Sequence, residues 1–105
     1  MSQPTALPLT VQVQYFGLIR EIVPVSEQSV TLPTAATVRD LLSMLFEQYG
    51  PRFRDALLAG NDQLLPNAVI ALNASNILHK QGMDTPIPAR CSLRILLMPA
   101  VAGGG

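Results

Sequence analysis

The sequence predicts an α+β domain in which a mixed five-stranded sheet carries one long helix on one face. Strand-like stretches occur near both ends of the chain, shorter ones lie between them, and one strongly amphipathic segment occupies the middle. A chain of 105 residues has room for a single domain. We assign residues 9–98 to this domain and expect flexible segments at residues 1–8 and 99–105.

The longest predicted strands lie at the two ends of the chain. Leu9–Phe16 alternates apolar and polar residues, which is typical of a half-buried strand, and a short helical turn is expected at Leu18–Val23. Gln28–Leu32 is expected to form a second strand, antiparallel to the first. The last strand, Ser92–Met98, is expected to lie parallel to the first in the centre of the sheet, where apolar strands are usual.

The long helix is expected to begin after Thr37, whose hydroxyl can cap it, with Asp40 at its third position. Apolar residues then recur at helical spacing, namely Val38, Leu41, Leu42, Leu45, Phe46 and Tyr49. Gly50 and Pro51 should end this helix.

The middle of the chain contains weaker signals. Arg52–Leu58 is expected to form a short second helix and Ala68–Leu72 a short strand. A turn over residues 73–76 and a brief strand at Ile77–Leu78 should follow, and then a loop over Gln81–Ala89.

Composition excludes several classes of function. Lys plus Arg and Asp plus Glu both number 7, so the chain has no basic field for nucleic acid or an anionic membrane. Apolar residues make up 49% and charged residues 13%, which suggests that a partner covers part of the apolar surface. No apolar run is long enough to span a membrane, so we expect a cytoplasmic protein. With one Cys and one His, no metal site is expected.

The chain ends on MPAVAGGG. Three terminal glycines taken alone are usually a disordered end, but the chemistry of glycine also suits a reactive one. Glycine has no Cβ, so a narrow channel can grip its backbone in any conformation. The seven residues Pro99 to Gly105 span at most about 23 Å when extended, enough to reach a buried site. A free α-carboxylate is a poor electrophile, and ATP can activate it, but the sequence lacks a Gly-rich phosphate-binding loop. A partner must therefore supply the ATP site.

Three features resemble one known family: the F-x-x-x-R-E pattern of Phe16, Arg20 and Glu21, the helix from Thr37, and the ending P-x-V-A-G-G over Pro99 to Gly104. Together they resemble the β-grasp, ubiquitin-like sulfur carriers of the MoaD/ThiS-like type. The YFGLIRE stretch is most like that of the molybdopterin synthase small subunit. The PAVAGG ending also occurs in other members, including the carrier of cysteine biosynthesis.

The resemblance implies a cycle at the terminal carboxylate. An E1-like adenylyltransferase would use ATP to adenylate Gly105, and a sulfur donor protein would convert the adenylate to a thiocarboxylate. The acceptor would be the large subunit of molybdopterin synthase or another sulfur acceptor enzyme. Gly103 and Gly104 would lie in the partner's channel behind the reactive end, and Gly104 would itself react if Gly105 were trimmed. The chain would hold no tight cofactor and would not be catalytic alone.

Strand alternation also predicts a docking surface. Leu93, Ile95 and Leu97 should face the helix, while Leu96 and Met98 should lie on the open face of the sheet beside Phe16. This apolar group next to the tail is a candidate partner-binding surface, unless flanking loops cover it. The residues that we expect to bind partners are Phe16, Leu96, Met98 and Val101.

Other interpretations stay open at this point. The carrier could serve thiamine or cysteine biosynthesis, the terminal carboxyl could instead be joined to lysines of target proteins, or the domain could bind partners with an inert tail. Cys91 is either a sulfur relay or a small half-buried residue, and His79 is expected in a solvated loop. Arg20 and Glu21 are expected to form a local ion pair or to take part in docking.

Overall fold

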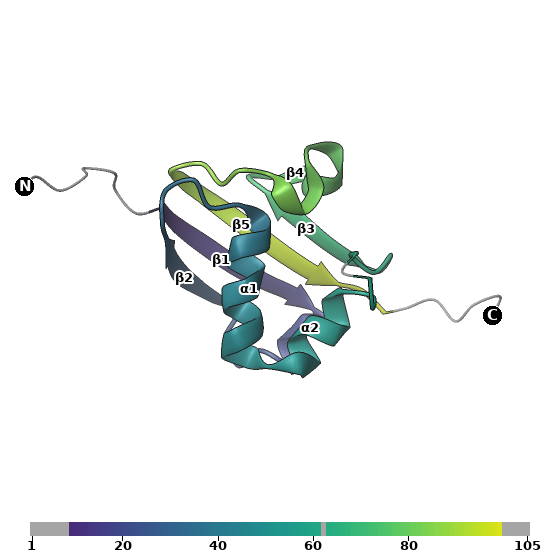
Figure 1. Ribbon diagram of the computed structural model, residues 1–105. Coiled ribbons are helices and arrows are strands. Elements are labelled where there is room, and N and C mark those ends of the chain that lie inside the picture. Colours follow the sequence, from purple (N-terminus) through teal and green to yellow (C-terminus); the bar gives the residue numbers. More distant parts are fainter. Residues whose placement is uncertain (1–8, 62, 100–105) are drawn as a thin grey trace, which may run out of the picture.

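The computed structural model describes residues 9–61 and 63–99, and in them the chain forms one five-stranded sheet of order β2-β1-β5-β3-β4 (Figure 1). The strands are β1 (Leu9–Gly17), β2 (Glu27–Leu32), β3 (Ala68–Leu72), β4 (Ser75–Asn76) and β5 (Arg90–Leu97). β1 and β5 are parallel, and the other pairs are antiparallel. The predicted mixed sheet, with the first and last strands side by side in it, is therefore confirmed.

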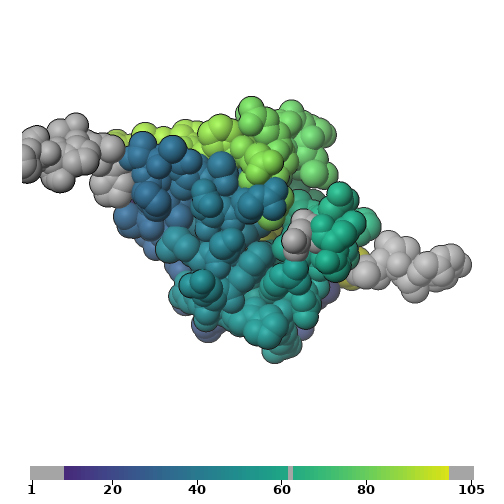
Figure 2. Space-filling model, in the orientation of Figure 1, coloured from purple at the N-terminus to yellow at the C-terminus, as the bar shows by residue number. Residues whose placement is uncertain are grey.

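Two helices, α1 (Val38–Tyr49) and α2 (Pro51–Leu57), lie on one face of the sheet (Figure 1). In the space-filling view they cover much of the sheet on this face (Figure 2). α1 begins at the predicted residue: the Thr37 hydroxyl accepts a hydrogen bond from the Asp40 amide, and the Asp40 carboxylate accepts one from the Thr37 amide. Gly50, between the helices, has a φ of 88°. These local signals explain why the sequence predicts both helices well.

The core lies between the sheet and α1. On β1 the inward residues Val11, Val13 and Tyr15 are buried, and Leu93 and Ile95 of β5 are buried beside them. The rings of Tyr15, Tyr49 and Phe53 pack against one another, with centroids 5.4 to 6.3 Å apart. This aromatic cluster joins β1 to α1 and α2.

The chain between β3 and β5 differs from the prediction. β4 is Ser75–Asn76 rather than Ile77–Leu78, because Asn73 and Ala74 both adopt positive φ and reverse the chain in two residues. Ile77–His79 forms a short 3-10 helix, η2, which begins where the Asn76 side chain accepts a hydrogen bond from the Leu78 amide. A further 3-10 turn, η3 (Gly82–Asp84), lies within the predicted loop.

Other boundaries shift by one or two residues. β5 begins at Arg90 and ends at Leu97, whereas the predicted strand ran from Ser92 to Met98. The predicted turn after β1 is a 3-10 helix, η1 (Leu18–Glu21). Among the described residues, no helix is long and apolar enough to cross a membrane. The predicted flexible segment at residues 1–8, and residues 100–105 of the predicted tail, lie outside the described residues.

The aromatic cluster leads to a prediction about alkaline pH. The Tyr15 hydroxyl donates a hydrogen bond to Oε1 of Gln28 at 2.7 Å, and the Tyr49 hydroxyl donates to the same oxygen. Burial, and then the neighbouring Tyr49 phenol, raise the pKa of Tyr15 far above its usual value. The folded state therefore holds this proton where the unfolded chain loses it, so its contribution to stability is complete below about pH 10 and is lost as the pH rises further.

We expect the free energy of unfolding to fall as the pH rises above about 10, and to fall less steeply in Tyr15→Phe, which has no phenol to ionise at this position. Urea denaturation at a series of pH values between about 9 and about 11 measures both slopes. Equal slopes in the two proteins would contradict the assignment to Tyr15.

Candidate functional site

The chain leaves the sheet from its central strand, β5, which lies between β1 and β3. The last ladder partners of β5 are Gly17 of β1 and Ala68 of β3, both opposite Leu97. Beyond them, the Met98 amide donates to the Asn67 carbonyl at 2.9 Å, and Nδ2 of Asn67 donates to the Met98 carbonyl at 2.8 Å. We call Leu97, Met98 and Pro99, with which the described chain ends, the tail root.

Gly17 permits a close approach of β1 to the tail root. Its φ is 74°, and a Cβ placed on it would lie 2.3 Å from the Leu97 carbonyl oxygen. No other residue type fits there without moving one of the two strands. Gly17 thus brings the ends of β1 and β5 together at the point where the tail begins.

The open face of the sheet carries an apolar surface beside the tail root. Phe16, Leu96 and Val69 stand opposite one another on β1, β5 and β3. With Ala71 and Arg94 they line a shallow depression of about 310 Å³. We call Phe16, Val69, Ala71 and Leu96 the apolar patch. Arg94 lies beside it, and its Nε donates to Oε1 of Gln14 at 3.3 Å.

The apolar patch is partly exposed to solvent, so the described loops do not bury it. Phe16 is 43% exposed and Met98 is 41% exposed, whereas Leu96 is half-buried. Met98 does not line the depression but follows it at the start of the tail. The structure thus brings Phe16 and Leu96 together and places Met98 two residues along the chain from Leu96. The other predicted site residues, Val101, Gly103, Gly104 and Gly105, lie outside the described residues.

Sequence reasoning missed several residues of this site. Val69 and Ala71 alternate with buried residues along β3, so the sequence could have indicated that they share one face of the sheet. It could not have indicated which residues of β5 they stand beside. Asn67 has no comparable signal, because only the register of β3 against β5 brings it to Met98. Arg94 lies two residues before Leu96 on β5, so strand alternation places it on the same face as Leu96.

The remaining candidates are placed apart from this site. Cys91 is half-buried on β5, and burial raises the pKa of its thiol, which disfavours the reactive thiolate. His79 ends η2 and is exposed. Arg20 and Glu21 are exposed in η1, and the expected ion pair between them is absent, since the ion pairs of the described residues are Arg39–Asp84 and Arg54–Asp55.

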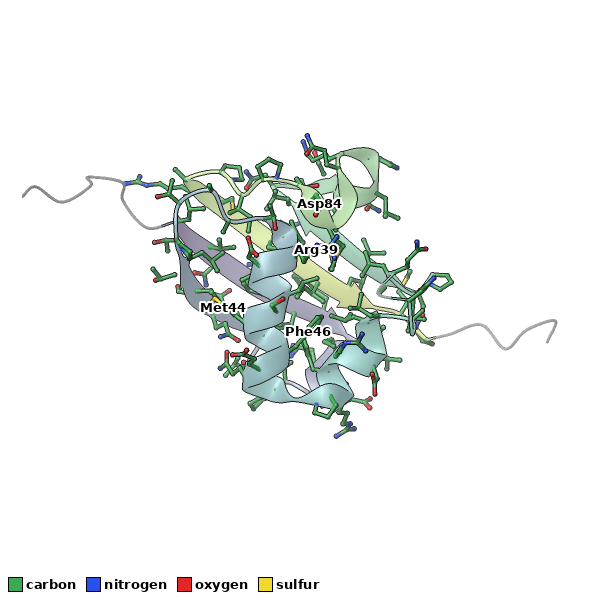
Figure 3. The ribbon with its side chains drawn as sticks, in the orientation of Figure 1. Arg39, Met44, Phe46 and Asp84 are labelled. Atoms are coloured by element: carbon green, nitrogen blue, oxygen red, sulfur yellow. The ribbon has the colours of Figure 1, made fainter. Side chains whose placement is uncertain are left out.

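On the face of the molecule that α1 and α2 cover, the described residues form a surface ion pair and apolar contacts but no cluster of reactive side chains. The Arg39 Nε lies 3.2 Å from the Asp84 carboxylate, a pair that joins α1 to η3 at the surface (Figure 3). Met44 and Phe46 lie on opposite sides of α1 in this view, with Met44 exposed and Phe46 packed against Phe53. Within residues 9–61 and 63–99, no three His, Cys, Asp or Glu residues gather as a metal site would require.

Comparisons with solved structures show which proteins share this fold. Small archaeal modifier protein 1 from Methanosarcina acetivorans has a TM-score of 0.74 and 23% identity, over 90% of this chain and 98% of its own. A Pyrococcus furiosus protein assigned as molybdopterin converting factor subunit 1 has a TM-score of 0.68 and 20% identity, over 87% and 99%. A chain of the Amycolatopsis orientalis BexX/CysO complex has a TM-score of 0.66 and 20% identity, over 88% and 99%.

These likenesses establish the β-grasp, ubiquitin-like fold that the sequence predicted. No curated protein sequence matches the chain significantly. The model of the ThiS family, however, matches residues 13–104, which is nearly the whole domain together with most of the glycine-rich end. This chain therefore belongs to the ThiS family.

Proposed function

We propose that this protein is a sulfur carrier whose terminal glycine is adenylated and then thiocarboxylated. The observation that carries the proposal is the geometry at the end of β5: the described chain ends at Pro99 beside an open apolar patch, and in the sequence only Ala100 to Gly105 follow. Family membership supports it, since the ThiS match extends over both parts. The body recognises partners, and the end carries the chemistry.

The proposed chemistry has two steps. The α-carboxylate of Gly105 attacks the α-phosphorus of ATP on the activating enzyme, which forms an acyl-adenylate and releases pyrophosphate. A sulfur nucleophile at the oxidation level of hydrosulfide then attacks the acyl carbon. The new C–S bond forms as the C–O bond to AMP breaks, and AMP leaves with the electron pair.

The partner must provide what this chain lacks. Adenylation needs cations and Mg²⁺ around the phosphates, but near the apolar patch the described residues offer Arg94, which is already hydrogen-bonded to Gln14. An E1-like adenylyltransferase would supply the ATP site, so we propose that the carrier is not catalytic alone and binds no cofactor tightly.

We further propose that the acceptor is the large subunit of a molybdopterin synthase. The YFGLIRE stretch supports this assignment over thiamine or cysteine biosynthesis. A fold shared with the Pyrococcus furiosus protein is compatible with it, although the same fold occurs in a modifier protein and in the BexX/CysO complex. Transfer of sulfur to purified acceptors from each of the three pathways, measured by loss of thiocarboxylate, decides between them.

Intact-mass spectrometry tests the main proposal. The protein is incubated with the activating enzyme, ATP, Mg²⁺ and sulfide. A mass increment equal to the exchange of one oxygen for sulfur supports the carrier, and omission of ATP should prevent it. Attachment of the chain to lysines of other proteins would instead indicate a protein modifier, and an unchanged mass would indicate a binding domain with an inert end.

The apolar patch and Met98 give a prediction about partner binding. Met98→Asp should weaken the complex with the activating enzyme at least about tenfold, because a carboxylate would be desolvated where the enzyme contacts the start of the tail. Its folding stability should change little, since Met98 is 41% exposed. Isothermal titration calorimetry measures the affinity.

Met44→Asp is the matched control for this substitution. Met44 is 43% exposed, almost the same as Met98, but it lies on α1, on the helical face (Figure 3). The control should bind the partner with wild-type affinity. Binding that is equally strong in both variants would remove the role that we assign to Met98.

A further inference from the structure

Two asparagines flank β3, and each extends its pairing with β5 by one residue. Asn67 precedes Ala68 and stands opposite Met98, and Asn73 follows Leu72 and stands opposite Ser92. At each end, one hydrogen bond of the pair joins backbone to backbone. The second comes from the asparagine side chain: Nδ2 of Asn67 donates to the Met98 carbonyl, and Oδ1 of Asn73 accepts from the Ser92 amide.

The two asparagine contacts differ in their position relative to the end of the ladder. Ser92 is inside β5, so its neighbours on both sides are held by the ladder. Met98 lies beyond the last ladder pair with β1, and Asn67 engages both its amide and its carbonyl. The next residue is Pro99, which has no N–H to donate and a fixed φ. The Asn67 contact is therefore the last hydrogen-bonded point of the described chain before the glycine-rich end.

The Met98 carbonyl is the group that determines how the chain continues. Its orientation defines the Met98–Pro99 peptide plane, and with φ of Pro99 fixed by its ring, it sets how Pro99 leaves the sheet and leaves ψ of Pro99 as the next free dihedral. The donor that holds this carbonyl is a side chain, so it can be removed without altering the backbone. Asn67 is also only half-buried, and no core packing depends on it.

We propose that Asn67 is a positioning residue for the reactive end: it orients the tail root so that the terminal carboxyl enters the active site of the activating enzyme. This inference rests on the proposed function. Without the Asn67 amide, the Met98 carbonyl turns freely, and binding must order at least one more backbone residue. The cost falls on binding and not on the chemical step, because the bound tail reaches the same position.

The test compares Asn67→Asp and Asn67→Ala with Asn73→Gly. Asn67→Asp keeps the shape of the side chain but removes its N–H donors, and Asn67→Ala removes the side chain. Asn73→Gly removes the equivalent contact at the other end of β3, and glycine suits the φ of 50° at that position. Asn67→Ala and Asn73→Gly should lower the thermal midpoint by a few degrees, since each loses one hydrogen bond, and Asn67→Asp by at least as much, since its carboxylate also repels the Met98 carbonyl oxygen.

Kinetics then separate positioning from stability. With ATP, Mg²⁺ and the activating enzyme, pyrophosphate release should show that both Asn67 variants raise the KM for the carrier about tenfold with little change in kcat. Asn73→Gly should keep the wild-type KM. In the Asn67 variants, the Met98 amide should also exchange with solvent faster than in the wild type, which reports the loosened tail root directly.

The outcomes distinguish the two proposals. If the wild-type protein is adenylated and the Asn67 variants keep its KM, or if Asn73→Gly raises the KM equally, the positioning inference is wrong and the carrier function stands. If the wild-type protein is never adenylated, the carrier function fails, and the positioning inference fails with it.

Discussion

Removing Gly105 is expected to lower the rate of thiocarboxylate formation by about 100-fold or more, because it draws the reactive carboxyl back by about 3.3 Å from the position in which the activating enzyme holds it. Displacements of this size disrupt the alignment of an attacking oxygen with the phosphorus of ATP. The folded domain should keep its stability, because glycine has no side chain to contribute to the core. Single-turnover assays with intact-mass detection measure the rate.

Gly105→Ala is the control for this deletion, since it keeps the length and adds one methyl group. If reach is decisive, the alanine variant should retain more activity than the deletion. Full activity of the deletion variant would show that Gly104 is the reactive residue and that Gly105 is removed before the reaction, which is the alternative that the sequence left open.

Gly17→Ala is expected to lower the free energy of unfolding by about 3 kcal/mol or more. Two penalties combine at this position. A φ of 74° with a ψ of −145° belongs to a region that is almost restricted to glycine. In addition, the new Cβ would lie 2.3 Å from the Leu97 carbonyl oxygen, so β1 and β5 would have to separate at their ends. Equilibrium denaturation in guanidinium chloride measures the loss.

Gly50→Ala separates these two penalties. Gly50 has a φ of 88° and a ψ of −176°, which also disfavours alanine, but no atom lies within 4 Å of a Cβ built on it. Its replacement should therefore cost about 1–3 kcal/mol, less than the replacement of Gly17. Equal losses in the two variants would show that the close approach of Gly17 to Leu97 contributes nothing.

Elements that depend on neighbouring residues were predictable from the sequence. The capping residues Thr37 and Asp40 lie three positions apart, and the apolar face of α1 repeats every turn, so both signals are contained in a short window. Alternation along β1 and β5 likewise predicted which side chains are buried. Phe16 and Leu96 were assigned to one face on this basis, and the ladder places them opposite each other.

The hairpin between β3 and β4 was not predictable in the same way. Ala74 has a φ of 72°, which alanine seldom adopts, and nothing in its sequence indicates this. The strain is tolerated because Asn73 is hydrogen-bonded to Ser92 on β5, and Ile77 is buried just after the turn. Tertiary contacts therefore explain why the short strand is Ser75–Asn76 and not the predicted Ile77–Leu78.

The sequence by itself determined the fold class, the long helix, the positions of the longer strands along the chain and the glycine-rich end, because each depends on residue types within a few positions of one another. Only the tertiary structure decided how the chain leaves the sheet at the end of β5. Gly17, Asn67 and Val69 contact residues 96–98, which are distant from them in the sequence, so no local pattern predicts these contacts. The physical reason is that strand register is set by how the whole core packs, and a shift of one residue would turn Leu96 inward and remove Asn67 from Met98.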